Sequence, residues 1–201
     1  MPFISPSRRK AVAFGLALPF ALSLATPSQA QTATRVRATI SAVEGDRVTL
    51  RTKDGQELKV KLVEPLTVSA RVRVDASAIT KGVFIGAAAI PGTGGALAGV
   101  EILVFPEAMR GTGEGHRPFD LLPESTMTNA TVAEEVTGAD GRSVRVTYKG
   151  GEQTIAITPE TRVFTLQPGS TADLKTGVAV NAAIEKDASG EFQTKRLTVD
   201  R

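Results

Sequence analysis

The feature that most constrains the fold is a repeat: two segments align without a gap at an offset of 95 residues. S-A-I-T-K-G-V-F-I-G-A-A (residues 77–88) lies over A-D-L-K-T-G-V-A-V-N-A-A (residues 172–183). The same register continues through three apolar pairs, Leu97/Phe192, Ile102/Leu197 and Val104/Val199. A gapless match of this length is hard to obtain by chance, and a period this long indicates two domains and not a solenoid. We therefore interpret the chain as a tandem duplication.

Each copy contains short runs in which apolar residues occupy every second position, which predicts half-buried strands. In the first copy these runs are residues 36–42, 48–52, 58–62 and 67–74, followed by a capped helical turn at 75–79 and strands at 83–90 and 97–105. Turns rich in Gly and Asp separate the first three runs, as tight hairpins require. The first three strands, the short helix and the last two strands have the order of a small OB-like Greek-key barrel, and the run at 67–74 is a further strand.

The second copy begins at Asn129 and has the same plan. Ala130-Thr131-Val132 matches residues 38–40, and Val144, Val146 and Tyr148 match Val48, Leu50 and Thr52. We predict an all-β fold with two tandem OB-like barrels, residues 35–105 and 129–200, joined by an ordered strap, residues 106–128. Roughly 70 residues per copy is near the lower limit for an independent core. We therefore expect the barrels to pack together, with Phe119, Leu121 and Leu122 of the strap buried between them.

Residues 1–30 have the pattern of a helical secretory signal peptide. Three basic residues (8–10) precede an apolar run (11–25), and Ser28-Gln29-Ala30 predicts cleavage after Ala30 and a periplasmic protein. Ser7-Arg8-Arg9 leaves twin-arginine export open beside the Sec route. The apolar run is too short to span a bilayer, so no membrane span is expected after cleavage. Because the chain has no cysteine, it forms no disulfide and carries no lipid at an N-terminal cysteine.

The formal net charge of the whole chain, +3, comes from this leader. It holds three of the 24 Lys and Arg residues and none of the 21 Asp and Glu residues, so the remainder is formally neutral. The chain also has only eight Phe, one Tyr and no Trp. Nucleic-acid binders usually show a basic stripe with stacking aromatics. We therefore expect no nucleic-acid partner.

The strap contains the only histidine of the chain, His116, among glycines and charged residues. The candidate ligand-binding residues are Arg110, Glu114, His116, Arg117 and Asp120. Arg110 and Arg117 are predicted to form the floor of a groove between the barrels that suits an anionic ligand. The same charges could instead pair with one another, and His116 could fix the strap through a hydrogen bond to the backbone.

Two further hypotheses involve the same histidine. Glu114, His116 and Asp120 could bind a divalent metal, although a single imidazole would leave carboxylates as the other ligands. His116 could also act as the base of a hydrolase, with Ser125, Thr126 and Thr128 nearby in the sequence. The chain has no G-x-S-x-G motif, and no cofactor is implied. A non-enzymatic binding role is therefore the preferred expectation.

The central run M-R-G-T-G-E-G-H-R-P-F-D-L, followed by S-T-M-T-N-A-T-V, resembles a family of uncharacterised exported proteobacterial proteins with OB-like domains of unknown function. The resemblance spans about residues 35–199. It implies a periplasmic protein with two such domains and supplies no activity. A ligand in that compartment could be an envelope glycan, a peptide or another protein.

Overall fold

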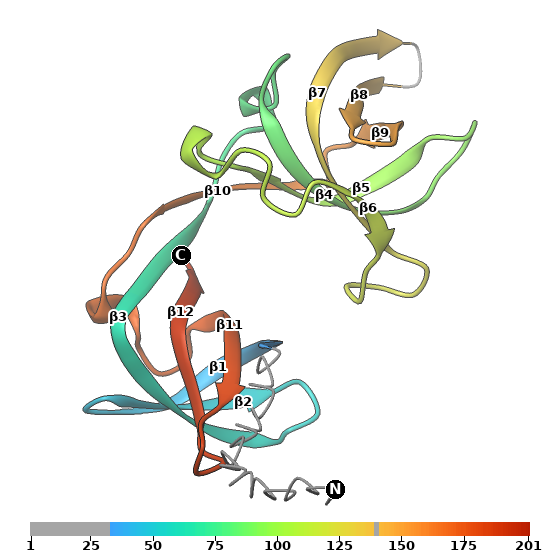
Figure 1. Ribbon diagram of the computed structural model, residues 1–201. Helices are drawn as coiled ribbons and strands as arrows, with labels where there is room; N and C mark the ends of the chain where they lie inside the picture. The colour runs from blue at the N-terminus through green and yellow to red at the C-terminus, as the bar shows by residue number, and fades with distance from the viewer. Residues whose placement is uncertain (1–32, 139–140) are drawn as a thin grey trace, which may run out of the picture. The chain divides into compact units, whose positions relative to one another are not determined.

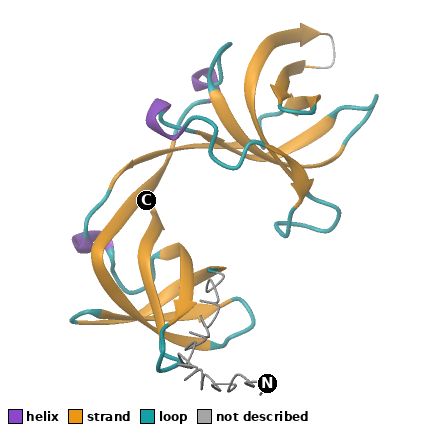
Figure 2. Ribbon diagram, viewed as in Figure 1, coloured by secondary structure: helices purple, strands orange, loops and turns teal. Residues whose placement is uncertain are grey.

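The computed structural model describes residues 33–138 and 141–201, which form an almost entirely β structure (Figures 1 and 2). The predicted signal peptide lies outside the described residues. Helical structure in the described ranges is limited to three short 3₁₀ turns, η1 (Ala76–Ala78), η2 (Glu107–Met109) and η3 (Thr171–Asp173). The predicted all-β fold class is confirmed.

The strands divide between the two halves of the chain. The first half contains β1 (Thr34–Glu44), β2 (Arg47–Thr52), β3 (Glu57–Arg73), β4 (Phe84–Pro91) and β5 (Leu97–Val104). The strap contains β6 (Gly115–Pro118). The second half contains β7 (Thr126–Gly138), β8 (Gly141–Tyr148), β9 (Gly151–Ile157), β10 (Arg162–Pro168), β11 (Ala179–Lys186) and β12 (Phe192–Asp200). The runs predicted at 58–62 and 67–74 are one continuous strand, β3, because the backbone between them stays extended.

Five strands close into the first barrel, in the order β1, β2, β3, β12, β11 and back to β1. Neighbouring strands are antiparallel except β3 and β12, which are parallel. This arrangement is that of an OB-type Greek-key barrel. Its buried core consists of Ile40, Val48, Leu50, Val60, Val68, Ala70, Leu174, Val180, Ala182, Ile184, Leu197 and Val199.

The second barrel has the same plan, in the order β7, β8, β9, β5, β4 and back to β7. A short parallel contact between β5 and β9 closes the ring, and β10 continues parallel to β5. Its buried core consists of Ile79, Ile85, Ala87, Ile102, Val104, Ala130, Val132, Val144, Val146, Ile155, Ile157 and Val163.

The two halves of the chain therefore exchange strands. The prediction placed each barrel within one contiguous segment, 35–105 or 129–200, but each core takes residues from both segments. The reason lies at the end of β3, where the chain does not turn back. Val74 N donates to Val163 O (3.0 Å), and Ile79 is already inside the second barrel. Arg142 of β8 also donates to Ala76 O at 2.7 Å and so fixes η1 there.

The pairing registers recur at the offset seen in the sequence. Ile85 pairs with Val104, and Val180 pairs with Val199, 95 residues later. Glu101 pairs with Arg162 in parallel, and the matching pair is Arg196 with Thr67. Corresponding strands thus occupy corresponding places in the two barrels.

β3 and β10 cross from one barrel to the other and pair antiparallel where they cross (Figure 1). The central pair is Arg71 with Leu166, two positions that are themselves 95 residues apart. Ser69 pairs with Pro168 and Arg73 with Phe164, so the pairing is symmetric about Arg71 and Leu166. Because these crossing strands join the barrels, the described strands form one continuous sheet.

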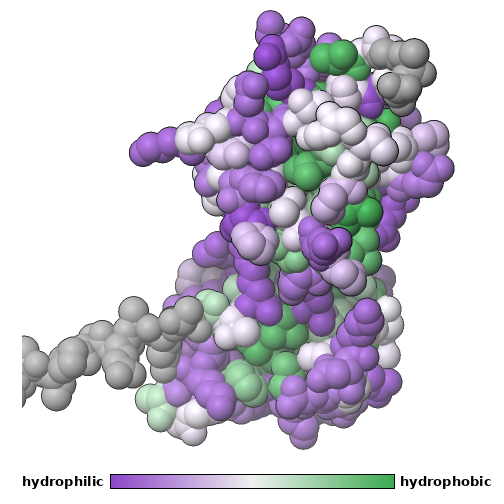
Figure 3. All heavy atoms as spheres, turned by 90° about the vertical axis from the view of Figure 1, so that its right-hand side faces the viewer, coloured by the Kyte–Doolittle hydropathy of each residue, from purple (hydrophilic) through white to green (hydrophobic). Residues whose placement is uncertain are grey.

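The face drawn in Figure 3 is mainly hydrophilic, with smaller groups of apolar side chains between. The large apolar side chains exposed among the described residues are Val43, Leu122 and Val136. None of the helical turns in the described ranges has the length or hydrophobicity needed to cross a membrane.

Candidate functional site

The strap lies mainly along the second barrel. Its strand β6 pairs antiparallel with β7, with His116 opposite Thr128. Arg110 donates to Gly82 O (2.8 Å) and forms an ion pair with Glu107 of η2. Glu114 Oε1 accepts a hydrogen bond from the backbone N–H of Lys149 at 3.0 Å. These contacts attach the strap to the turn before β4 and to the β8–β9 hairpin.

His116 is exposed, and its Nδ1 lies 2.8 Å from Thr128 Oγ1. Its ring stacks beside Tyr148, with 6.3 Å between the centroids. Thr128 is fully buried, so a substrate has no access to its hydroxyl. This arrangement suits a structural contact between the strap and β7. The partner is a threonine side chain and not the backbone atom that the structural alternative expected.

The end of the strap reaches the first barrel. Arg37 of β1 forms an ion pair with Asp120 (3.0 Å) and lies over the ring of Phe119, 4.7 Å from its centroid. Phe119 and Leu121 are half-buried, and Leu122 is 44% exposed. The prediction that these three side chains are buried between the barrels was wrong, because the paired strands β3 and β10 occupy the junction.

The five candidate residues do not converge on one point. Arg110 contacts Glu107, and Glu114 contacts Lys149. His116 contacts Thr128, and Asp120 contacts Arg37. Arg117 donates to Gly113 O at 2.9 Å. Within residues 33–138 and 141–201, no group of three or more His, Cys, Asp or Glu side chains is placed to hold a metal ion. The proposed metal ligands Glu114, His116 and Asp120 are thus not brought together.

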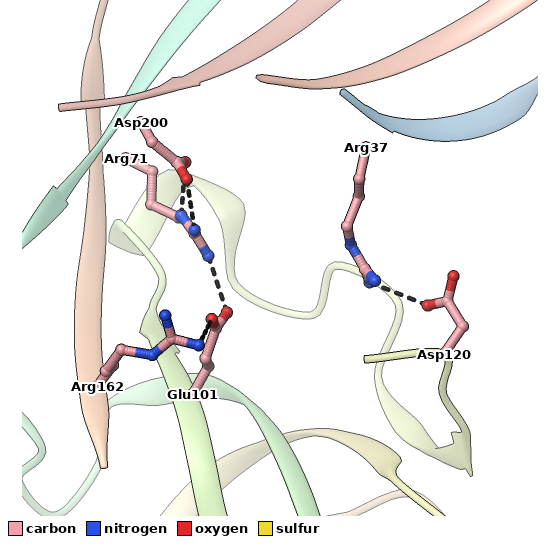
Figure 4. Close-up of polar contacts among 6 residues, drawn as sticks. All are labelled: Arg37, Arg71, Glu101, Asp120, Arg162 and Asp200. Atoms are coloured by element: carbon pink, nitrogen blue, oxygen red, sulfur yellow. Dashed lines mark hydrogen bonds and ion pairs between the residues drawn. The ribbon is translucent and has the colours of Figure 1, made fainter. Parts of the chain in front are cut away.

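Sequence reasoning missed a cluster of ion pairs at the crossing strands (Figure 4). Arg71 donates to both carboxylate oxygens of Asp200, at 2.8 and 2.7 Å, and to Glu101 at 3.0 Å. Arg162 pairs with the other oxygen of Glu101, and Arg71 also lies 4.2 Å above the ring of Phe164. Alternation identifies these positions as outward-facing but cannot say which strands lie beside them.

Burial lowers the pKa of Arg71, but the hydrogen bonds and charges of Asp200 and Glu101 outweigh burial and raise it above its usual value. The guanidinium of Arg71 therefore stays charged, and its ion pairs with Glu101 and Asp200 link β3 to β5 and β12.

A cleft of about 150 Å³ adjoins this cluster. Its charged lining residues are Arg37, Arg71, Glu101 and Asp200, and Leu121 of the strap forms part of its wall. The arginines predicted for such a groove, Arg110 and Arg117, do not line it. Because Arg37 and Arg71 already bind carboxylates, the cleft offers no uncompensated cation to a ligand.

The first barrel carries a second group of charges, on the outer side of β3 and β12. Lys59, Lys61, Lys195 and Arg196, which we call the basic face, have no carboxylate within ion-pair distance among the described residues. The neighbouring arginines are already paired, Arg47 with Glu191 and Arg51 with Glu57 (2.9 Å).

Lys59 is opposite Thr49 on β2, and Arg196 is opposite Thr67 on β3. Lys61 lies between Arg47 on β2 and Gln193 on β12. Glu57 precedes Lys59 by two positions on β3, and the charge of Lys59 contributes to lowering its pKa, behind the hydrogen bond from Arg51.

The matching positions of the second barrel are different. At the offset of 95, Lys59 and Lys61 correspond to Thr154 and Ala156, and Lys195 and Arg196 correspond to Val100 and Glu101. The same fold therefore forms without these cations.

Comparison of the chain with protein-family models, curated proteins and solved structures finds no match. The interpretation of its function therefore depends on its own geometry.

Proposed function

We propose that the protein is a non-enzymatic binding module of the periplasm that holds a partner across an outer face of an OB-like barrel. The observation that supports this proposal is the basic face of the first barrel. OB-type barrels bind extended ligands across strands 2 and 3 and the adjoining loops, and this step is an analogy of fold. The corresponding strands here are β2 and β3, and β3 carries both Lys59 and Lys61.

The strap takes a structural role in this proposal. Its candidate residues make separate contacts with both barrels, through Arg110, Glu114 and His116 on one side and Asp120 on the other. A divalent-metal-binding accessory protein and a hydrolase with His116 as base remain the alternatives. For the metal alternative, the described residues hold no group of three or more His, Cys, Asp or Glu side chains placed to bind an ion. For the hydrolase alternative, His116 does contact the hydroxyl of Thr128, but that hydroxyl is buried.

We also propose that export through the leader at residues 1–30 and a tandem duplication explain the sequence pattern. The recurring strand registers support the duplication. The proposed relation to the uncharacterised exported family depends on the central run of the strap. Fractionation of cells that express the chain with and without residues 1–30 tests the periplasmic assignment.

Thermal unfolding tests the proposed function. Residues 31–201 are melted with envelope glycans, with divalent cations and with chelator, as wild type and as His116→Ala. A ligand at about 100 times its Kd adds roughly 2.7 kcal/mol. We expect a glycan ligand to stabilise both forms equally and the chelator to change neither. Stabilisation by a metal that is lost in His116→Ala, or hydrolysis that is lost in that variant, would overturn the proposal.

A further inference from the structure

We infer that the basic face of the first barrel binds an acidic polysaccharide; this inference rests on the proposed binding function. The first step is the strand exchange. Lys59 and Lys61 belong to β3 and Lys195 and Arg196 to β12, and these strands are neighbours only because β12 closes the first barrel. If each copy closed its own barrel, the offset of 95 would put Val100 and Glu101 in the places of Lys195 and Arg196. The exchange thus places Lys195 and Arg196 on the strand beside the one that carries Lys59 and Lys61, and it keeps the carboxylate of Glu101 out of that strand.

The second step is that the fold does not require these charges. The second barrel has the same strand order and register, with Thr154 and Ala156 in place of the two lysines. Lys61 lies directly opposite Arg47, and like charges opposite one another on a sheet repel, so the basic face costs some stability. An anionic ligand would offset this repulsion.

The third step selects a glycan over other polyanions. The first barrel is a closed ring, so β2, β3 and β12 have neighbours on both sides and offer no sheet edge to an acidic peptide. Single-stranded nucleic acids stack their bases on aromatic side chains, and the outward residues Thr49, Thr67 and Gln193 are not aromatic. Lysine and arginine beside threonine hydroxyls suit a polymer that alternates carboxylates with hydroxyl groups.

The test measures binding of soluble polygalacturonate to residues 31–201 by calorimetry at low and moderate salt. Neutral dextran and poly-glutamate are the comparison ligands. In the variant Lys59→Thr/Lys61→Ala, each lysine is replaced by the residue found at the matching position of the second barrel, Thr154 or Ala156. The control, Lys81→Ala/Lys149→Ala, loses the same charge at exposed positions elsewhere.

We expect wild type and control to bind polygalacturonate with similar Kd, more weakly as salt rises, and dextran not to bind. Exposed ion pairs contribute up to about 1 kcal/mol each, so the Kd of the double variant should rise about fivefold to tenfold. Melting of each variant verifies that it is folded.

The outcomes separate the inference from the proposed function. Equal binding by wild type and the double variant would overturn the assignment of the face. Binding of dextran or poly-glutamate in preference to polygalacturonate would overturn the acidic-glycan inference and leave a binding function in place. If none of these three ligands binds and no envelope glycan stabilises the protein in the melting experiment, both proposals fail.

Discussion

Replacing Arg71 by Met should destabilise the protein far more than removing an ordinary surface arginine. Its side chain is 21% exposed, and those of Glu101 and Asp200 are 16% and 31% exposed. Breaking a fully buried pair costs about 3–5 kcal/mol, whereas an exposed pair contributes about 0–1 kcal/mol. Because water still reaches part of this cluster, we expect a loss between these limits, about 2 kcal/mol. For a chain of this size that loss lowers Tm by about 4–8 °C.

The matched control is Arg51→Met, which removes an ion pair with Glu57 whose side chains are 60% and 51% exposed. Its effect should stay within about 0.5 kcal/mol. Both variants and wild type are compared by urea unfolding and by calorimetry. Equal destabilisation by Arg71→Met and Arg51→Met would refute the claim that Arg71 fixes the crossing strands.

Three further predictions concern single positions. In Gly86→Ala the new Cβ would lie 2.8 Å from Asn129 Oδ1, so calorimetry should show a loss of about 1–3 kcal/mol from overpacking. His116→Ala leaves a buried threonine hydroxyl unpaired, so urea unfolding should show a loss of about 1 kcal/mol that chelator does not change. Hydrogen bonds from the hydroxyl of Ser189 and from backbone N–H groups lower the pKa of Asp187 below its usual value. The ionised Asp187 therefore stabilises the folded state at pH values above its unfolded pKa of about 4, and this stabilisation is lost as the pH falls through the folded pKa. Asp187→Asn should therefore flatten the dependence of Tm on pH between about pH 5 and 2, and an unchanged slope would contradict this.

Much of the fold was predictable from the sequence, because period two in short runs fixes which residues face the core. The buried residues Val48, Leu50, Val144 and Val146 lie on the predicted strands. The helical turn after β3 was also predicted, and Asp75 caps it by accepting a hydrogen bond from Ser77 N.

The strand exchange was not predictable from the pattern. Each copy supplies the same strands whether it closes its own barrel or its neighbour's, and the inward residues of β11 and β12 suit either core. The choice depends on the path of the chain between β3 and η1, where Val74 bonds to Val163. Alternation contains no information about that path.

The candidate site was anticipated only in part. The sequence drew attention to the strap and to His116, which does contact β7 through Thr128. It did not locate the cluster around Arg71 or the basic face, since both bring together residues from strands far apart in the chain. Such a grouping becomes visible only when the strand order is known.

The strand exchange is the central claim, because it places β12 beside β3 and so creates the basic face. Engineered disulfides test it directly, since the chain has no cysteine of its own. Arg35 pairs with Ala183 across β1 and β11, and antiparallel neighbours lie about 4.5–5.5 Å apart between Cα atoms, within the range for a disulfide. If each copy closed its own barrel, Arg35 would instead face Ala88, the residue 95 positions before Ala183.

The measurement is the fraction of intrachain disulfide formed on mild oxidation of Arg35→Cys/Ala183→Cys and Arg35→Cys/Ala88→Cys, determined by thiol titration and mass spectrometry. The exchanged arrangement predicts nearly complete bonding in the first variant and free thiols in the second. Bonding in the second variant and free thiols in the first would contradict it.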